Sequence, residues 1–177
     1  MACLPIKNIE EINLIKDFCK KKNKIQELLI FTLAINTGAD VKDLLNLKVK
    51  DVKDKLYLKV FETKIKSVPL TDDLIELIKK VISGKSDSDF LFERKKGKVL
   101  DRTTVYYVFK DIYNQLGLNA DYTIASWRKT FAYHHYQKYK DIAYLMWLFN
   151  QSTVQVAFKF IDVKENMNLR FKEGVCL

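Results

Sequence analysis

The segment TGADVKDLL, residues 37–45, contains the break between two predicted helices and the start of the second, in the first quarter of the chain. Residues 25–36 before it are strongly apolar, which is typical of a helix buried in the core. Gly38 is expected to end that helix, because glycine adopts the left-handed conformation of a C-cap without steric cost. After it a shorter helix is predicted, with the apolar residues Val41, Leu44, Leu45 and Leu47.

Periodic patterns extend from this turn in both directions. Upstream, Asn8 is a predicted N-cap with Glu11 at the third helical position, and the helix is expected to end in the lysine-rich residues 20–24. Downstream, alternation over residues 56–61 resumes at 68–70, which predicts a hairpin or a three-stranded sheet. A short extended piece is predicted at 90–92 and further helices over residues 71–83, 101–117, 126–138, 142–149 and 153–160. The predicted fold class is therefore α+β, mostly helical with one small antiparallel β-sheet.

Composition limits the class of protein. A chain of 177 residues with 48% hydrophobic residues fits one domain with a real core, and 5 Gly with 2 Pro argue against linkers and low complexity. No apolar stretch is long enough to span a membrane, and the start lacks a signal-peptide pattern, so a cytoplasmic location is expected. The three cysteines lack ligand spacing, so neither a metal site nor a disulfide framework is predicted, and no cofactor is expected.

The charge points to a partner. Lys and Arg number 31 against 22 Asp and Glu, a formal charge of +9, which favours nucleic acid as the partner of a cytosolic chain. Four of the 31 are Arg, leaving 27 Lys, so phosphate contact is favoured over base reading. The alternative is a lysine-rich surface with no ligand.

Three segments in this order are distinctive together: TGADVKDLL (37–45), WRKTFA (127–132), and residues 148–152 followed by 158–161. They resemble the catalytic domain of the tyrosine recombinases, the phage integrase family, over about residues 5–163. The resemblance implies a single catalytic domain over residues 1–177, without the N-terminal DNA-binding domain that most members carry. It also implies that the tail, residues 164–177, packs either on a neighbouring subunit or back on its own core.

The sequence departs from the family's pattern at the residues that carry out the reaction. Active members attack a DNA phosphodiester with a tyrosine, while arginines, a lysine and histidines stabilise the negative charge of the transition state. Because these groups work as a unit, losing several of them predicts that this chain is not an enzyme. The family positions that are changed are Asp40 (for arginine), Ala125 (for histidine), Gln151 (for histidine) and Phe160 (for the tyrosine nucleophile).

Arg128 is the family arginine that is retained, and it is predicted to contact a DNA phosphate or to pair internally. The family lysine lies in the hairpin, where Lys64 and Lys66 form either a phosphate-binding turn or a solvated one. His134 and His135 are expected to pack structurally. The remaining DNA-contact candidates are Lys129 beside Arg128, the loop residues Arg94, Lys95 and Lys96, and Arg102, Thr103, Thr104 and Tyr106 at the start of the helix over 101–117.

Three functions follow as hypotheses. The leading one is a catalytically inactive, integrase-like protein that binds double-stranded DNA as a phage or mobile-element regulator, either a repressor or a recombination accessory factor. Such a protein would act in the bacterial cytoplasm at the nucleoid, as a homo-oligomer or together with an active recombinase or another phage regulator. The alternatives are a divergent site-specific recombinase or integrase, and a protein-interaction module that docks on a recombinase complex.

Overall fold

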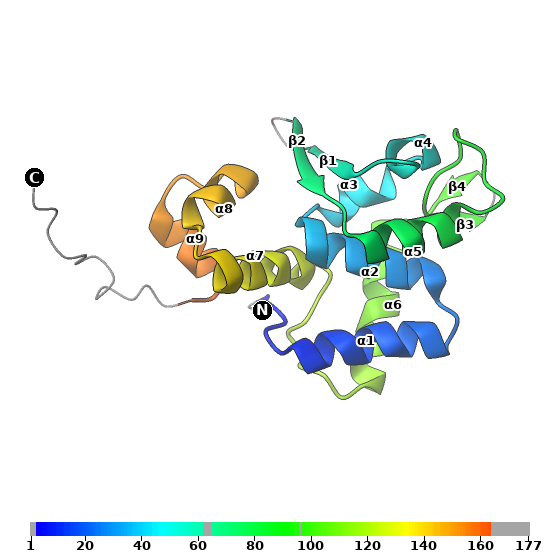
Figure 1. Cartoon of the computed structure of the whole chain (residues 1–177). Coiled ribbons are helices and arrows are strands. Elements are labelled where there is room, and N and C mark those ends of the chain that lie inside the picture. Colours follow the sequence, from blue (N-terminus) through cyan, green and yellow to red (C-terminus); the bar gives the residue numbers. More distant parts are fainter. Residues whose placement is uncertain (1–2, 62–64, 96, 164–177) are drawn as a thin grey trace, which may run out of the picture.

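A computed structural model describes residues 3–61, 65–95 and 97–163 (Figure 1). Helix α2 (Ile25–Thr37) lies at its centre and packs against the helices on each side of it. The other elements, in chain order, are α1 (Ile9–Lys21), α3 (Val41–Leu45), α4 (Val49–Val52), β1 (Tyr57–Phe61), β2 (Ile65–Pro69), α5 (Asp72–Ile82), β3 (Glu93–Lys95), β4 (Lys98–Val99), α6 (Arg102–Gln115), α7 (Ser126–Tyr139), α8 (Ile142–Phe149) and α9 (Val154–Phe160).

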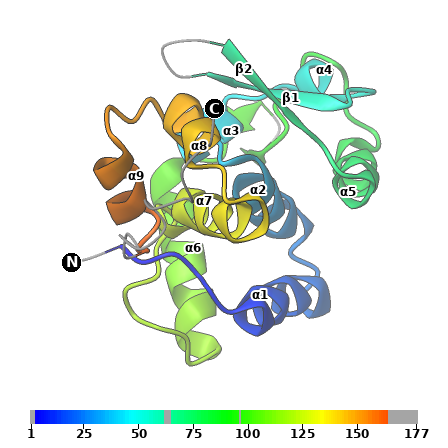
Figure 2. The same cartoon turned by 60° about the vertical axis from the view of Figure 1, so that its left-hand side comes forward.

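Helix α2 is buried on nearly every side, as its sequence predicts. Leu29, Ile30, Phe31, Leu33 and Ala34 are fully inaccessible to solvent, and a helix that is apolar all round needs neighbours on all its faces. Helices α1, α3, α5 and α7 supply those neighbours (Figure 2). Gly38 ends the helix in the left-handed conformation, with φ of 68°, so the predicted C-cap is confirmed.

Aromatic rings join α2 to α6 and α7. The indole of Trp127 is fully buried and lies edge-on to Phe31 and Phe109, with ring centroids 5.6 and 4.5 Å apart. Its Nε1 donates a hydrogen bond of 2.7 Å to the hydroxyl of Tyr113. Because the polar edge of the indole has a partner, this large side chain can be buried at no hydrogen-bonding cost. The start of α7 is thereby fixed to the core.

The sheet prediction needs a correction, because the described residues form two small antiparallel sheets instead of one. Strands β1 and β2 pair in the register Leu58↔Val68, which puts two buried side chains opposite each other. Strands β3 and β4 form a second hairpin. The sequence does not reveal this hairpin, because its strands are too short to show alternation. The mostly helical α+β class is confirmed.

One short helix is also absent from the sequence prediction. Helix α4 is a single turn, too short for a helical period, and the carboxylate of Asp51 caps it by accepting a hydrogen bond of 2.8 Å from the amide of Lys48. At the first helix, Asn8 is the N-cap as predicted and accepts from the amide of Glu10 at 2.8 Å. None of the described helices is long and apolar enough to cross a membrane. The predicted docking of the tail over residues 164–177 lies outside the described residues.

Candidate functional site

The turn after α2 brings three segments of the chain together. A Cβ added to Gly38 would lie 2.8 Å from the Phe131 ring of α7 and 2.9 Å from the Phe149 ring of α8. Real Cβ atoms do not approach other atoms so closely, and φ of 68° is itself unfavourable for other residues. Glycine is therefore required at position 38 for two reasons: its backbone conformation, and the space that the two rings already fill.

Arg128 stands in the first turn of α7, next to the buried Trp127. The carbon of its guanidinium lies 4.7 Å from the centroid of the Phe149 ring, a cation–π contact. The side chain is half-buried, and the aromatic ring restricts its freedom. Gly38, Phe149 and Arg128 thus form a chain of contacts in which the glycine admits the ring and the ring positions the arginine.

Arg128 lines a pocket of about 170 Å³, which we call the Arg128 pocket. Its walls come from the N-terminal segment, the α2–α3 turn, and the ends of α6, α7 and α9. The lining residues are Cys3, Ala39, Asp40, Val41, Arg102, Ile124, Ala125, Arg128, Lys129 and Phe160. Three of the four positions at which the sequence is predicted to depart from the family, Asp40, Ala125 and Phe160, therefore line one pocket with Arg128. The fourth, Gln151, is not among the lining residues of this pocket. Its backbone N–H donates to the carbonyl of Met146 in α8.

The lining combines several cations with one carboxylate. Arg102, Arg128 and Lys129 line the pocket together with Asp40. The Asp40 carboxylate caps α3 by accepting a hydrogen bond of 2.8 Å from the amide of Lys42. Phe160 contributes only carbon atoms, and no tyrosine is among the lining residues of the described chain. The pocket can therefore hold an anion, but its described lining offers no tyrosine to attack phosphorus.

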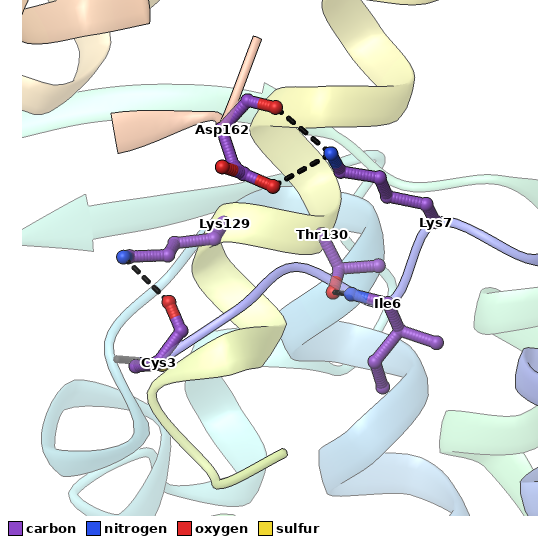
Figure 3. A network of polar contacts seen from close by, with 6 residues as sticks. All are labelled: Cys3, Ile6, Lys7, Lys129, Thr130 and Asp162. Atoms are coloured by element: carbon purple, nitrogen blue, oxygen red, sulfur yellow. Dashed lines mark hydrogen bonds and ion pairs between the residues drawn. The ribbon is translucent and has the colours of Figure 1, made fainter. Parts of the chain in front are cut away.

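The N-terminal segment, residues 3–7, crosses α7 beside this pocket (Figure 3). The ammonium of Lys129 donates to the carbonyl of Cys3 at 2.7 Å, and the amide of Ile6 donates to Oγ1 of Thr130 at 2.9 Å. Lys7 forms an ion pair of 2.6 Å with Asp162, just after α9. Lys129 therefore already has a partner within the protein. No local sequence pattern indicates the role of this segment, because its contacts join residues more than 120 positions apart.

Lys66 corrects the predicted basic turn. Only 3% of this residue is exposed, and its ammonium donates to the carbonyl of Leu148 and to Oδ1 of Asn150, both at 2.8 Å, and to the carbonyl of Trp147. It thus satisfies the last carbonyls of α8, where the helix dipole favours a cation. An ammonium held in this way is not part of an exposed phosphate-binding surface. Lys64 lies outside the described residues.

The start of α6 also differs from the prediction. Asp101 caps the helix by accepting from the amide of Thr104 at 2.8 Å and from its hydroxyl at 2.6 Å, and these bonds lower the pKa of Asp101. A hydroxyl has a single proton, and in this structure Thr104 donates it to Asp101. Arg102 and Thr103 remain exposed.

The other DNA-contact candidates lie apart from the pocket lining. Tyr106 is half-buried, with its ring 5.3 Å from that of Tyr107. Arg94 is exposed on β3, and the backbone of Lys95 pairs with Lys98 in the hairpin. Lys96 lies outside the described residues. These residues remain predictions, because neither their exposure nor their pairing shows a ligand.

His134 and His135 pack structurally, as predicted. Nε2 of His134 lies 3.0 Å from the carbonyl of Ile6, and the His135 ring stacks on Tyr144 with centroids 4.6 Å apart. Burial lowers the pKa of His135 below its ordinary value of 6.5. Both histidines and Tyr144 line a separate groove of about 660 Å³, not the Arg128 pocket. Tyr144 therefore lines a different cavity from Arg128.

Comparison with known proteins now identifies the family. The model of the phage integrase family matches residues 8–166, and the chain belongs to this family. The chain is 30% identical over 166 residues to "Probable integrase/recombinase YoeC" of Bacillus subtilis strain 168, covering 92% of this chain and 91% of that protein. It is 29% identical over 141 residues to tyrosine recombinase XerA of Pyrococcus furiosus, covering 75% of this chain and 49% of XerA.

Solved structures share the fold. The crystal structure of XerA recombinase superposes with a TM-score of 0.74 at 19% identity, covering 94% of this chain and 63% of that one. The XerH recombinase bound to its difH substrate gives a TM-score of 0.75 at 22% identity, covering 96% and 54%. The chain thus spans nearly all of YoeC but about half of XerA, and the predicted catalytic-domain fold is confirmed.

Proposed function

We propose that this member of the phage integrase family binds duplex DNA without cleaving it and serves as a regulator, either a repressor or a recombination accessory factor. The observation that carries the proposal is Phe160, which lines the Arg128 pocket with a hydrocarbon ring next to the retained arginine. The ring has no hydroxyl, so it cannot form the phosphotyrosyl bond of the family's reaction.

The other changes in the pocket support the same interpretation. Asp40 places a negative charge where the transition state is negative, and Ala125 has no imidazole to donate a hydrogen bond. Removing a single preorganised donor of this kind typically costs about 10²–10³ in rate. Groups that act together do not compensate for one another when several are missing.

The DNA-binding half of the proposal is based on charge. The chain carries a formal +9, and Arg102 and Arg128 line one pocket at the ends of α6 and α7. Family relatives of known structure include a recombinase bound to its DNA substrate. We propose the same class of ligand, double-stranded DNA, for this chain.

The test combines a binding assay with a cleavage assay. Fluorescence anisotropy on duplexes from the neighbourhood of its own gene, with random duplex as control, is measured at two salt concentrations. A nicked duplex that traps covalent intermediates is then analysed on a denaturing gel. We expect salt-dependent, site-selective binding and no covalent product. A covalent adduct would overturn the proposal, and an affinity insensitive to salt would favour a protein-interaction module instead.

A second candidate is a divergent recombinase that uses a tyrosine from a partner. The observation in its favour is the match to "Probable integrase/recombinase YoeC" over 91% of that protein's length. The discriminating experiment mixes the chain with an active relative whose own arginines are inactivated. Product formed only in the mixture would support this candidate. If product is absent in the mixture, as we expect, the candidate is rejected.

A further inference from the structure

The N-terminal segment holds one of the predicted DNA contacts in an internal bond. The ammonium of Lys129 donates to the carbonyl of Cys3 at 2.7 Å, and Cys3 itself lines the Arg128 pocket (Figure 3). We infer that Cys3 and Leu4, which we call the lid, compete with DNA for Lys129, so that the lid opens when a duplex binds. This inference rests on the proposed binding of DNA and adds a conformational step to it.

The N-terminal segment is fixed firmly just after the lid. Ile6 is inaccessible to solvent, its amide donates to Oγ1 of Thr130 at 2.9 Å, and its carbonyl lies 3.0 Å from Nε2 of His134. Pro5, which precedes it, is buried as well. These contacts attach the segment to α7 from Pro5 onward, so the lid can move while the rest of the segment stays in place.

The lid itself is held by weaker contacts. Cys3 and Leu4 are both partly exposed. The sulfur of Cys3 lies 3.3 Å from Oγ of Ser126 and 3.5 Å from Oγ1 of Thr123, and a thiol is a weak hydrogen-bonding group. Water can replace the bonds of Cys3 when the lid lifts, and a bond exchanged for one with water contributes little net stability. Opening the lid therefore costs much less than removing Ile6 from the core.

A DNA phosphate is a stronger partner for the Lys129 ammonium than the lid is. The carbonyl of Cys3 carries a partial negative charge, whereas a phosphate carries a full one, and its neutralisation also releases counterions from the DNA. In the closed state the ammonium lies 5.7 Å from the centroid of the Phe160 ring, which bears no formal charge. DNA therefore offers the larger electrostatic gain, and the affinity for DNA depends on how firmly the lid is held.

A disulfide that locks the lid provides the test. Ser126→Cys puts a second thiol next to Cys3, where the native side-chain atoms lie 3.3 Å apart. In a Cys176→Ser background, with Cys19 fully buried, oxidation should join positions 3 and 126, and reduction should free the lid. Mass spectrometry of proteolytic fragments identifies the joined pair. Fluorescence anisotropy on a random duplex then gives the affinity of each form over a range of salt concentrations.

The reduced form should bind the duplex more tightly than the oxidised form. A lysine that neutralises one phosphate contributes about 0.9 to the slope of log K against log salt, so oxidation should remove about 0.9 of slope. The gap in affinity should accordingly widen about threefold when the salt concentration falls about fourfold. Adding Lys129→Gln should make both forms bind like the oxidised parent, because the contact that the lid controls is then absent.

Matched controls separate the lid from other effects. Adding Cys3→Ser to the Ser126→Cys protein prevents the disulfide, so the oxidant should leave its affinity unchanged. Lys79→Gln removes the same charge as Lys129→Gln from an exposed position on α5, and it should keep the full difference between the two forms. Thermal unfolding confirms that each form is folded.

A second variant tests the lid without a disulfide. Cys3→Gly removes the thiol contacts and gives the backbone of the lid more freedom, so it should bind duplex more tightly than the unmodified protein. The gain should disappear when Lys129→Gln is added. An affinity of Cys3→Gly equal to that of the unmodified protein would contradict the inference.

Equal slopes for the oxidised and reduced forms would overturn the inference and leave the proposed DNA binding in place. A difference that persists in Lys129→Gln would overturn it too, because the lid would then act through another group. If no form binds duplex DNA, the proposed function and this inference both fail. Binding by the reduced form alone would support both.

Discussion

The buried residues packed next to the Arg128 pocket and the residues that line it differ in exposure. Gly38, Phe149 and Trp127, which we call the packing layer, are buried, and Trp127 is fully inaccessible to solvent. Among the lining residues, Asp40, Ala125 and Phe160 are all at least partly accessible. A substitution at an accessible helix end leaves no buried cavity, whereas one in the packing layer would. The comparison teaches that residues lining the pocket can change without disturbing the packing that maintains the fold.

The largest expected effect comes from putting the family's groups back. The fourfold variant Asp40→Arg, Ala125→His, Gln151→His and Phe160→Tyr should form a covalent adduct with nicked duplex, because the packing layer is already in place. The measurement is the adduct band on a denaturing gel. The threefold variant that keeps Phe160 is the control and should give none. A fourfold variant that is folded but inactive would show that the packing layer does not position the restored groups for the reaction.

A smaller but clear effect on stability is expected from a substitution in the packing layer. Gly38→Ala should lower the free energy of unfolding by about 2–4 kcal/mol, from the unfavourable φ plus the clash with two rings. Urea unfolding followed by tryptophan fluorescence measures it. Gly84→Ala is the matched control, because Gly84 has φ of 80° and a Cβ added there would meet nothing within 4 Å. It should show the conformational cost alone, about 1–2 kcal/mol, and equal losses would contradict the packing argument.

Lys66 tests the connection between the hairpin and α8. Lys66→Met keeps the length of the side chain but leaves the carbonyls at the end of α8 without their donor, so we expect a loss of about 2–3 kcal/mol. Lys59→Met, at an exposed position on β1, should change stability by less than about 0.5 kcal/mol. Denaturant unfolding of both variants measures the two free energies of unfolding and tests whether they differ as expected. A neutral Lys66→Met would mean that the buried ammonium contributes no net stability.

The smallest expected effect is a pH dependence outside the pocket. Burial lowers the pKa of His135 below 6.5, Asp141 raises it and Lys138 lowers it further, so the unfolded state binds the proton more readily. This contribution to stability is full above about pH 6.5 and is lost as the pH falls toward the lower folded-state pKa. His135→Phe keeps the ring and should reduce the loss of stability between about pH 7.5 and about pH 5.5. An unchanged loss would assign the dependence to other groups.

Local signals make most of the fold predictable from the sequence. Helix periods, the Gly38 turn and the Asn8 cap depend on neighbouring residues, so they can be located without coordinates. The short α4 and the β3–β4 hairpin cannot, because four residues or fewer show no period. The family pattern brings Asp40, Ala125 and Phe160 to one site, where the structure also places them.

Long-range contacts explain why the sequence does not reveal the partners of Lys66 and Lys129. Lys66 bonds to a carbonyl 82 residues away, and Lys129 to one 126 residues away. A lysine in a sequence carries no sign of such a partner, so the pattern favours a surface cation at both positions. The partner of Thr104 is local, because its hydroxyl donates to the capping carboxylate of Asp101. The sequence assigns Arg102 to a DNA-facing helix, but its position in the same pocket as Arg128 requires the tertiary structure.

The N-terminal segment has a practical consequence for following the pocket in solution. Cys3 lines the Arg128 pocket and is partly exposed, whereas Cys19 is fully buried and burial raises the pKa of its thiol to about 12. Thiolates attack thiol-reactive dyes, so in a Cys176→Ser background the label should go to Cys3. A fluorophore attached there would sit at the rim of the pocket, and its emission would report each time a ligand arrives and leaves.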